Sequence, residues 1–401
     1  MSVTIEVFPA LMGDCFLISF GEDQKTHILI DGGMITTYKT YLKPRLIELA
    51  KKGEVLSLVI VSHIDADHIA GILELIKENG DADNPRIIPI QEIWHNSYRH
   101  IQFRAKGNKK INLFEEEILK SIVRNGLPKG SEELKQPVSA EQGSSLASLL
   151  LKGKYPWNLS FNSQAIVAGS SKIEIFNQVM ITVLSPNKCN LEDLEKHWFN
   201  KLNSMRYGFK FAEDELFDDA FEFLLVQEKK SQLKVRKIAE KRDILALASE
   251  KFVEDTVLTN RSSIAVIIEY REYKLLFMGD AVPSVLLQKN ELIRHNEDQH
   301  YFDLIKIAHH GSASNTSQEL LNVFKGTNYL LSTNGTHGHP DIETIARIIT
   351  TNKNQKKKLI FNYPIILPGN FYEPKLMEEF KFQIEQFGGD KSIVLCLDEK
   401  G

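Results

Sequence analysis

The residues His63-Ile64-Asp65-Ala66-Asp67-His68 place four ionisable side chains within one short stretch of the chain. The apolar run 58–61 before them predicts a buried strand, and the run 69–76 after them predicts a helix. Carboxylates and imidazoles crowded between two buried elements are costly unless they pair with each other or bind a metal. The alternative is an ordinary loop with a hydrogen-bonded histidine. The density of ligand groups favours a metal site, and one such loop could serve two neighbouring cations.

Several further segments resemble a known family. The first motif is similar to the His-x-His-x-Asp-His signature of the metallo-β-lactamase fold hydrolases, with Asp65 in place of the second histidine. This variant resembles the branch that includes the hydrolase domain of the ComEC DNA-uptake proteins. The other similar segments are Gly13–Ile18, Ile28–Gly33, Leu275–Ala281, Lys306–Ser312 and Gly335–Pro340. The resemblance covers about residues 1–95 and 255–345, and it implies an α/β protein with a four-layer αββα sandwich.

The resemblance also implies ligands for a binuclear metal site. His63 and Asp65 would bind the first cation, and Asp67 and His68 would bind the second. Asp280, at the end of a predicted strand, would bridge both cations, which reduces their mutual repulsion and sets their spacing. A water molecule between two such cations loses its proton near neutral pH, and Asp67 would orient this nucleophile.

A late histidine would complete the second site. The match favours His339, and His337 is the alternative two residues earlier. Relatives with full zinc sites carry another histidine about twenty residues before the bridging aspartate. In this chain the corresponding residues 259–263 contain no histidine, and Asn260 is a nearby oxygen ligand. Oxygen ligands move the preference from Zn²⁺ toward Mn²⁺ or Mg²⁺. We expect one or two divalent cations, Mn²⁺ or Zn²⁺ first and Mg²⁺ as the alternative, with the first site weakly filled or empty.

The pair His309-His310 follows another predicted strand. In the nuclease-like branches a histidine in this loop donates a proton or stabilises charge at the scissile phosphate, and either member of the pair could do so. We favour His310, because Gly311 allows a close backbone approach and Ser312 adds a hydrogen bond. No serine or cysteine nucleophile is required by this chemistry.

Two further acids lie at strand ends near the expected site. Asp31 precedes two glycines, and in related proteins such an acid hydrogen-bonds the metal ligands. Asp14 is similar in kind and could lie closer to the substrate. Capping of a turn is an equally good interpretation of each residue, so the sequence leaves both roles open.

Composition limits the class of protein. The chain has 401 residues, 42% of them apolar, which is enough for a large core. No stretch approaches the roughly 18 apolar residues of a membrane span, and the N-terminus does not resemble a signal peptide. The three scattered cysteines indicate a reducing compartment, and the net charge of −4 gives no global attraction for polyanions. We therefore expect a cytoplasmic protein with no membrane partner and leave its oligomeric state open.

The organisation is predicted as one hydrolase domain over residues 1–401, with an irregular or helical excursion at 96–170 and a helical insertion at 190–255. Strands are expected near 3–9, 15–20, 26–30, 57–61, 86–94, 172–176, 179–184, 263–269, 273–278, 303–308, 328–332, 358–361 and 392–396. Helices are expected near 38–51, 69–79, 111–123, 144–151, 283–290, 317–325, 341–351 and 374–386. The insertion is either a solvated helical hairpin or an arm that docks a protein partner or grips substrate.

These observations favour a metal-dependent hydrolase, with a phosphodiesterase or nuclease as the leading hypothesis and nucleic acid as the expected substrate. The basic residues Lys229, Lys230, Lys234, Arg236 and Lys237 could form a local positive groove. Hydrolysis of another ester, such as a lactone, a thioester or a small phosphodiester, is the alternative. A metal-binding module that docks a partner protein is a third hypothesis, from a different class.

Overall fold

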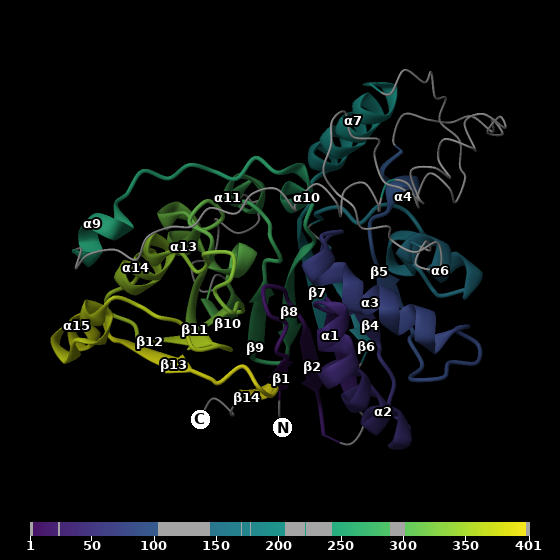
Figure 1. Ribbon diagram of the computed structural model, residues 1–401, viewed down its shortest axis with the longest axis horizontal. Coiled ribbons are helices and arrows are strands. Elements are labelled where there is room, and N and C mark those ends of the chain that lie inside the picture. Colours follow the sequence, from purple (N-terminus) through teal and green to yellow (C-terminus); the bar gives the residue numbers. More distant parts are fainter. Residues whose placement is uncertain are drawn as a thin grey trace, which may run out of the picture.

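Two β-sheets face each other between outer layers of helices in the computed structural model of the protein (Figure 1). The structure describes residues 3–22, 25–102, 145–169, 171–176, 178–204, 221, 243–288 and 301–397. Helices from the N-terminal part cover one sheet, and helices from the C-terminal part cover the other. The predicted αββα sandwich of the metallo-β-lactamase fold is therefore confirmed.

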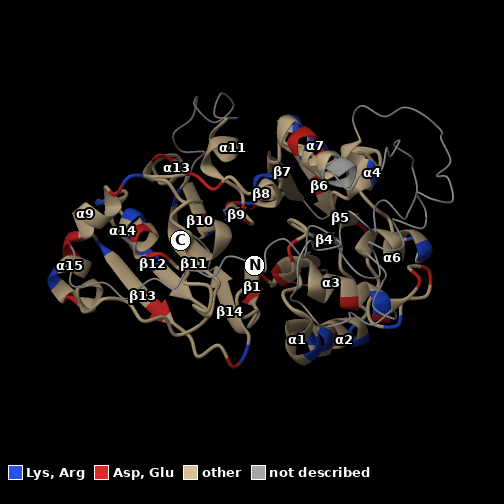
Figure 2. Ribbon diagram, turned by 45° about the horizontal axis from the view of Figure 1, so that its top comes forward, with Lys and Arg blue, Asp and Glu red and all other residues tan. Residues whose placement is uncertain are grey.

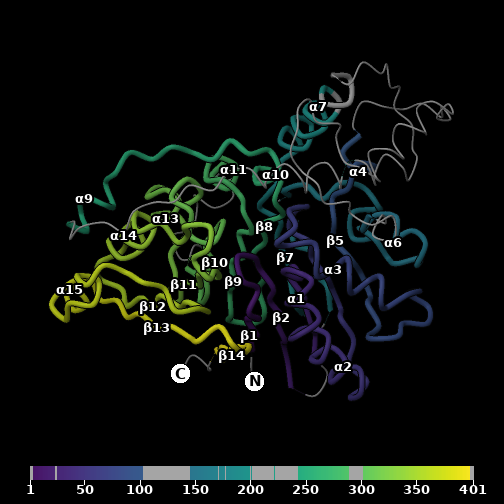
Figure 3. The backbone as a smooth tube through the Cα atoms, in the orientation of Figure 1, coloured from purple at the N-terminus to yellow at the C-terminus, as the bar shows by residue number. Residues whose placement is uncertain are grey.

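The first sheet has six strands in the order β14-β1-β2-β3-β4-β5. Their bounds are β1 Val3–Val7, β2 Phe16–Phe20, β3 Thr26–Ile30, β4 Leu58–Ile60, β5 Ile93–Trp94 and β14 Ile393–Leu397. β1, β2, β3 and β14 pair antiparallel, whereas β4 runs parallel to β3 and β5. The helical segments that follow β3 and β4 are α1 Ile35–Thr37, a π-helical turn Tyr38–Leu42, α2 Lys43–Lys51 and α3 Ala66–Asn79. Figure 3 shows the two ends of the described chain close together, because β14 pairs with β1.

The second sheet has eight strands in the order β13-β12-β11-β10-β9-β8-β7-β6. Their bounds are β6 Ile173–Phe176, β7 Val179–Ser185, β8 Ala265–Tyr270, β9 Tyr273–Phe277, β10 Tyr301–Lys306, β11 Lys325–Leu331, β12 Lys357–Phe361 and β13 Phe382–Gln386. Strands β6 to β9 pair antiparallel and β9 to β13 pair parallel. The helices on this side are α11 Pro283–Leu287, α13 Gln318–Val323, α14 Ile342–Thr350 and α15 Pro374–Glu379.

The core lies in three layers because side chains alternate between the two faces of each strand. In β2, Phe16 and Ile18 point into the cluster between the sheets, whereas Leu17 belongs to the cluster beneath the helices. The ring of Phe16 lies 5.5 Å from that of Phe277, which joins the first sheet to the second. This packing brings the loops after β4 and β9 to one edge of the sandwich.

Two predicted elements differ from the structure. The helix expected over 374–386 ends at Glu379, and residues 382–386 form β13, since Phe382 and Ile384 alternate with polar residues and pair with β12. The strand expected over 86–94 is limited to Ile93–Trp94. The Asn79 side chain accepts hydrogen bonds from the backbone N–H groups of residues 87 and 88. These two residues therefore bond to the end of α3 instead of a strand. The helix expected over 111–123 lies outside the described residues.

The two predicted excursions are described in part. Their described helical segments are α4 Tyr98–Ile101, α6 Leu146–Lys152, the 3₁₀ turn Leu159–Phe161, α7 Lys188–Ser204, α9 Ile244–Ala248 and, just beyond them, α10 Leu258–Arg261. Trp198 of α7 is fully buried against the rings of Tyr98 and Phe221. Residues 103–144, 205–220 and 222–242, including the basic cluster 229–237, lie outside the described residues. None of the described helices has the length and hydropathy needed to cross a membrane.

Candidate metal centre

Three loops deliver the predicted ligands to one place. His63 follows β4 of the first sheet, while Asp280 follows β9 and His309 follows β10 of the second sheet. β9 and β10 are parallel neighbours, so their carboxyl ends lie at the same edge of their sheet. The two sheets face each other (Figure 1), and His63 from the first sheet and Asp280 from the second approach to 3.5 Å between Nε2 and Oδ2.

The buried Asp280 carboxylate lies between four imidazole rings. Its Oδ2 atom is 3.5 Å from His63 Nε2 and 3.6 Å from His309 Nε2. Its Oδ1 atom is 3.6 Å from His68 Nε2 and 3.9 Å from His310 Nε2. Each carboxylate oxygen therefore lies nearest to its own pair of histidines, although the ligand atoms of His63, His68 and Asp280 also lie within 4.8 Å of one another.

The other two acids of the first motif divide between these pairs. Asp65 Oδ2 lies 3.0 Å from His63 Nε2. Asp67 Oδ2 lies 3.4 Å from His310 Nε2 and 3.8 Å from His68 Nε2. We call His63, Asp65 and Asp280 Oδ2 the first cluster. Asp67, His68, His310 and Asp280 Oδ1 are the second cluster.

The second cluster fits a bound cation. Two ligand atoms about 2.1 Å from one tetrahedral metal ion lie about 3.4 Å apart, close to the observed separations. The Nε2 atoms of His68 and His310 are buried and form no hydrogen bond with any described residue. Because a buried nitrogen without a partner is costly, a metal ion between these atoms would satisfy both rings.

The far side of each histidine is held by hydrogen bonds. His68 Nδ1 lies 2.8 Å from Asp31 Oδ2, the contact that the resemblance implies for this acid. His310 Nδ1 donates to the Ser332 carbonyl oxygen at 2.9 Å. Such contacts keep the proton on Nδ1, so the Nε2 lone pair faces the cluster and can bind a cation.

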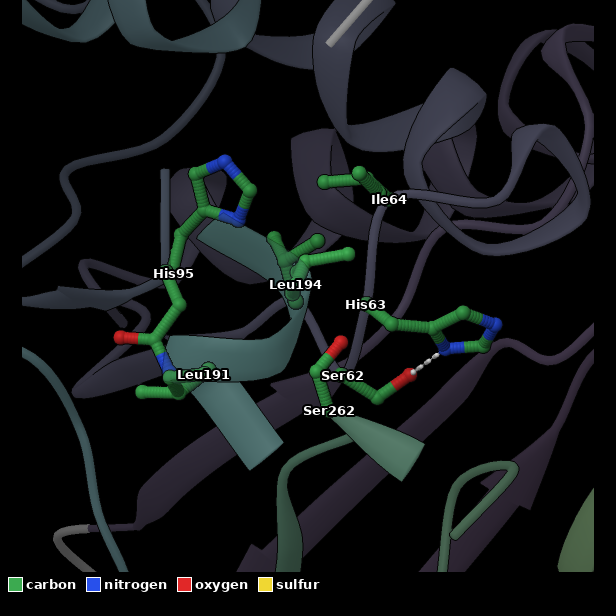
Figure 4. A pocket seen from close by; sticks show the side chains of 9 residues that line it. Ser62, His63, Ile64, His95, Leu191, Leu194 and Ser262 are labelled. Carbon is green, nitrogen blue, oxygen red and sulfur yellow. Dashed lines mark hydrogen bonds between the residues drawn. The ribbon is translucent and has the colours of Figure 1, made fainter. Parts of the chain in front are cut away.

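His63 is held by hydroxyl groups. Its Nδ1 atom lies 3.0 Å from Ser62 Oγ and 3.1 Å from Ser263 Oγ. Figure 4 shows the first of these bonds, beside a small pocket that separates His63 from His95. The pocket is lined by Leu191 and Leu194 of α7 and by a mixture of apolar and polar residues that follow the strands.

A buried ion pair that the sequence did not assign lies beneath the second cluster. The Lys306 ammonium contacts Asp14 Oδ2, and Asp14 Oδ1 is 3.5 Å from His310 Nδ1. Burial alone would raise the pKa of Asp14, but Lys306 and the histidines lower it to about 2. The signal in the sequence was a lysine within the apolar strand run 304–307.

The site attracts positive charge. Burial alone would lower the pKa of His63, but the carboxylates of Asp65 and Asp280 raise it to about 10. The carboxylates of Asp14 and Asp280 likewise raise the pKa of His310 to about 10, against the effect of burial. Without a metal, protons would occupy these nitrogens, and a divalent cation would displace them on binding.

The late histidines lie on the loop that follows β11. His339 Nδ1 lies 3.5 Å from Asp341, and its ring centroid is 5.2 Å from that of His309. His337 is exposed on the loop. The geometry favours His310 over His339 at the second cluster, because the strained turn at 308–311 carries the His310 ring to Asp67 and Asp280.

Close backbone contacts keep these loops together. A Cβ atom on Gly13 would lie 1.8 Å from the carbonyl oxygen of Asp67. Asp31, His309 and His310 have positive φ angles of 56°, 45° and 55°. Non-glycine residues adopt this left-handed conformation at a cost that the surrounding structure must offset, and such residues concentrate at functional sites.

Comparisons with known proteins found a family model and several solved structures that are similar to this chain. The sequence model of the metallo-β-lactamase superfamily matches residues 9–133. Similar solved structures include the metallo-β-lactamase fold protein YhfI of Bacillus subtilis, with 9% identity over 98% of this chain and 99% of that one and a TM-score of 0.34. Zn²⁺-bound PqqB of Methylobacterium extorquens has 12% identity over 96% and 87%, with a TM-score of 0.35. A point mutant of the CmlA β-hydroxylase has 9% identity over 99% and 54%, with a TM-score of 0.39.

A search of curated proteins found no match. The family match covers the first metal-binding motif, and the fold places the remaining candidate ligands around it. Residues 9–133 of this chain are therefore similar to the metallo-β-lactamase superfamily, whose members are mostly metal-dependent hydrolases that bind divalent cations, typically Zn²⁺.

Proposed function

We propose that the protein is a metal-dependent phosphodiesterase, with nucleic acid as its leading substrate. The observation that carries this proposal is the division of ligands across Asp280, whose two oxygens lie nearest to separate histidine pairs. This arrangement suits two cations that share one carboxylate. Such a pair suits in-line displacement at phosphorus, where both the attacking and the leaving oxygen need stabilisation.

Each residue of the two clusters has a proposed role. His63 and Asp65 would hold the first cation, Asp67, His68 and His310 the second. When bound, the cations would lower the pKa of a water molecule and offset the charge that develops on the phosphoryl group. The Asp67 side chain is 18% exposed, more than the neighbouring His68, so it can accept a hydrogen bond from an incoming water. The buried ion pair of Asp14 would keep the loops of both sheets in register.

The ligand type favours a phosphodiester over a carbonyl ester. Asp65 replaces a histidine of the common motif, and a carboxylate favours harder cations such as Mn²⁺ or Mg²⁺. These cations are common partners of phosphate oxygens. The ComEC-like form of the motif and the His309-His310-Gly311-Ser312 segment point the same way.

The charge distribution favours a second candidate, hydrolysis of a small phosphodiester. On the described elements, lysines and arginines are interspersed with acids along the ribbon (Figure 2). A long nucleic acid would need a continuous basic stripe or an equivalent supplied by the basic cluster 229–237. A small diester needs the metal centre alone.

Cleavage assays would distinguish these functions. Labelled single- and double-stranded DNA and RNA, and the small diester bis(p-nitrophenyl) phosphate, would be incubated with Mn²⁺, Mg²⁺ or Zn²⁺. Asp280→Ala removes the shared carboxylate, and Asp303→Ala is the matched control, since Asp303 is buried and bonds the Lys274 backbone N–H. Metal-dependent cleavage lost in Asp280→Ala but kept in Asp303→Ala is the expected result. Absence of all phosphodiester cleavage by metal-loaded protein would refute the proposal.

A further inference from the structure

We infer that His309 supplies the nitrogen ligand that the first cation lacks in the sequence, and that Asp255 and Asn315 orient it. His309 and His310 then serve one cation each, so neither acts as the proton donor. This inference rests on the proposed metal centre and deepens it. The contacts of the His309 ring carry it.

Asn260 lies in the segment where relatives with full zinc sites carry a histidine, but here it has a different role. Asn260 Nδ2 donates to Asp255 Oδ2 at 2.5 Å. The same Asp255 oxygen lies 3.5 Å from His309 Nδ1. Asn260 therefore helps to hold a carboxylate against His309, and the histidine reaches the site from the β10 loop instead.

The neighbouring amide of Asn315 fixes the proton on His309. Asn315 Nδ2 donates to Asp255 Oδ2 at 3.2 Å and to the Asp280 carbonyl oxygen at 3.0 Å. These two acceptors fix the amide orientation, so its Oδ1 atom faces His309 Nδ1 at 3.0 Å. Since Oδ1 can only accept, His309 donates from Nδ1 at this contact, and its Nε2 is the ring nitrogen directed at the cluster.

This nitrogen faces the first cluster. His309 Nε2 lies 3.6 Å from Asp280 Oδ2, the oxygen that also faces His63 Nε2 at 3.5 Å. Both distances are near the separation of about 3.4 Å expected for two ligands of one tetrahedral ion. A ring nitrogen and a carboxylate oxygen at this distance attract each other when a proton or a metal ion lies between them, and a divalent cation would displace the proton.

The backbone is shaped to send consecutive histidines to opposite oxygens. Residues 309 and 310 have φ/ψ of 45°/54° and 55°/19°, so both are left-handed. The His309 N–H donates to the Gly279 carbonyl oxygen at 3.0 Å, which ties this turn to the loop of Asp280. The two rings lie 5.8 Å apart at an angle of 68°, one on each side of the carboxylate.

Metal stoichiometry tests the inference without relying on turnover. Metal-free full-length protein would be titrated with Mn²⁺ by calorimetry, and bound Co²⁺ would be followed by its visible absorption. We use His309→Asn, because asparagine tolerates the left-handed conformation but has too short a side chain to reach Asp280 Oδ2. Its matched control is His100→Asn, which changes a buried histidine whose ring packs against Trp157.

We expect two ions in the wild type and in His100→Asn, but one tight ion in His309→Asn, with the other weakened at least about 100-fold. Asp255→Asn should weaken the same ion by about 10- to 100-fold, because it removes the carboxylate that supports the ring. If His309→Asn binds two ions with wild-type affinity but loses turnover, His309 is a proton donor and the inference is wrong. If the wild type binds fewer than two ions, the proposed centre itself fails.

Discussion

Exchanging Asp31 for asparagine should reverse the tautomer of one metal ligand without changing the shape of the site. Asp31 is fully buried, and its Oδ1 accepts the Ser62 backbone N–H at 2.7 Å. Its Oδ2 lies 2.6 Å from Ser62 Oγ and 2.8 Å from His68 Nδ1. In Asp31→Asn the amide oxygen keeps the backbone bond, so the amide nitrogen faces His68. It would donate to Nδ1 and move the ring proton to Nε2.

The size of the effect follows from the role of Nε2 in the second cluster. A protonated Nε2 cannot bind a cation, and loss of such a supporting carboxylate costs about 10- to 100-fold in metal affinity. At about 1.4 kcal/mol per decade, this corresponds to about 1.4–2.8 kcal/mol of binding free energy. The substitution adds no backbone strain, because asparagine tolerates the positive φ of this position as well as aspartate does. The protein should therefore stay folded.

Calorimetric titration with Mn²⁺ or Zn²⁺ would measure the change. One of the two ions should weaken by about 10- to 100-fold, while the ion held by His63 and Asp65 keeps its affinity. Asp303→Asn is the control, since it makes the same exchange at a buried acid that accepts a backbone N–H. Wild-type affinity for both ions in a folded Asp31→Asn protein would show that Asp31 does not set the tautomer of His68, and the reasoning would be refuted.

Three further predictions concern stability. Burial, with His95 and Arg99 nearby, lowers the pKa of His100 to about 3, so the unfolded chain binds the extra proton and stability falls as the pH drops from about 6.5 toward about 3. Between pH 8 and pH 5, the free energy of unfolding measured with urea should fall by about 2 kcal/mol less in His100→Gln than in the wild type. Equal decreases in the two proteins would contradict the assignment. A Cβ on Gly71 would lie 2.0 Å from the Gly32 carbonyl oxygen, so Gly71→Ala should cost about 1–3 kcal/mol of unfolding free energy, whereas Gly369→Ala, with open space around it, should be nearly neutral. Trp198→Ala should cost about 3–5 kcal/mol in the same assay if α7 is an integral part of the core, and a cost below about 1 kcal/mol would show that it is not.

Local patterns predicted most of the framework. The apolar run at 58–61 and the helical period at 69–76 correspond to β4 and α3, and the first motif lies between them as expected. The error at 374–386 arose because a short helix and a short strand follow each other with little between them. Pairing with β12 decided for a strand at β13, and such pairing is a tertiary contact.

The fold and the positions of the candidate ligands at strand ends could be predicted from the chain alone, because hydrophobic period and motif order are properties of neighbouring residues. The choice of the late histidine that faces the carboxylates could not. That choice depends on two consecutive left-handed residues at 309 and 310, a conformation that no local propensity predicts for histidine. The ion pair of Asp14 with Lys306 and the contact of Asp255 with His309 likewise join residues far apart in the chain. These residues become neighbours only after both sheets have packed. Burial then makes an unpaired charge costly, which favours the pairing.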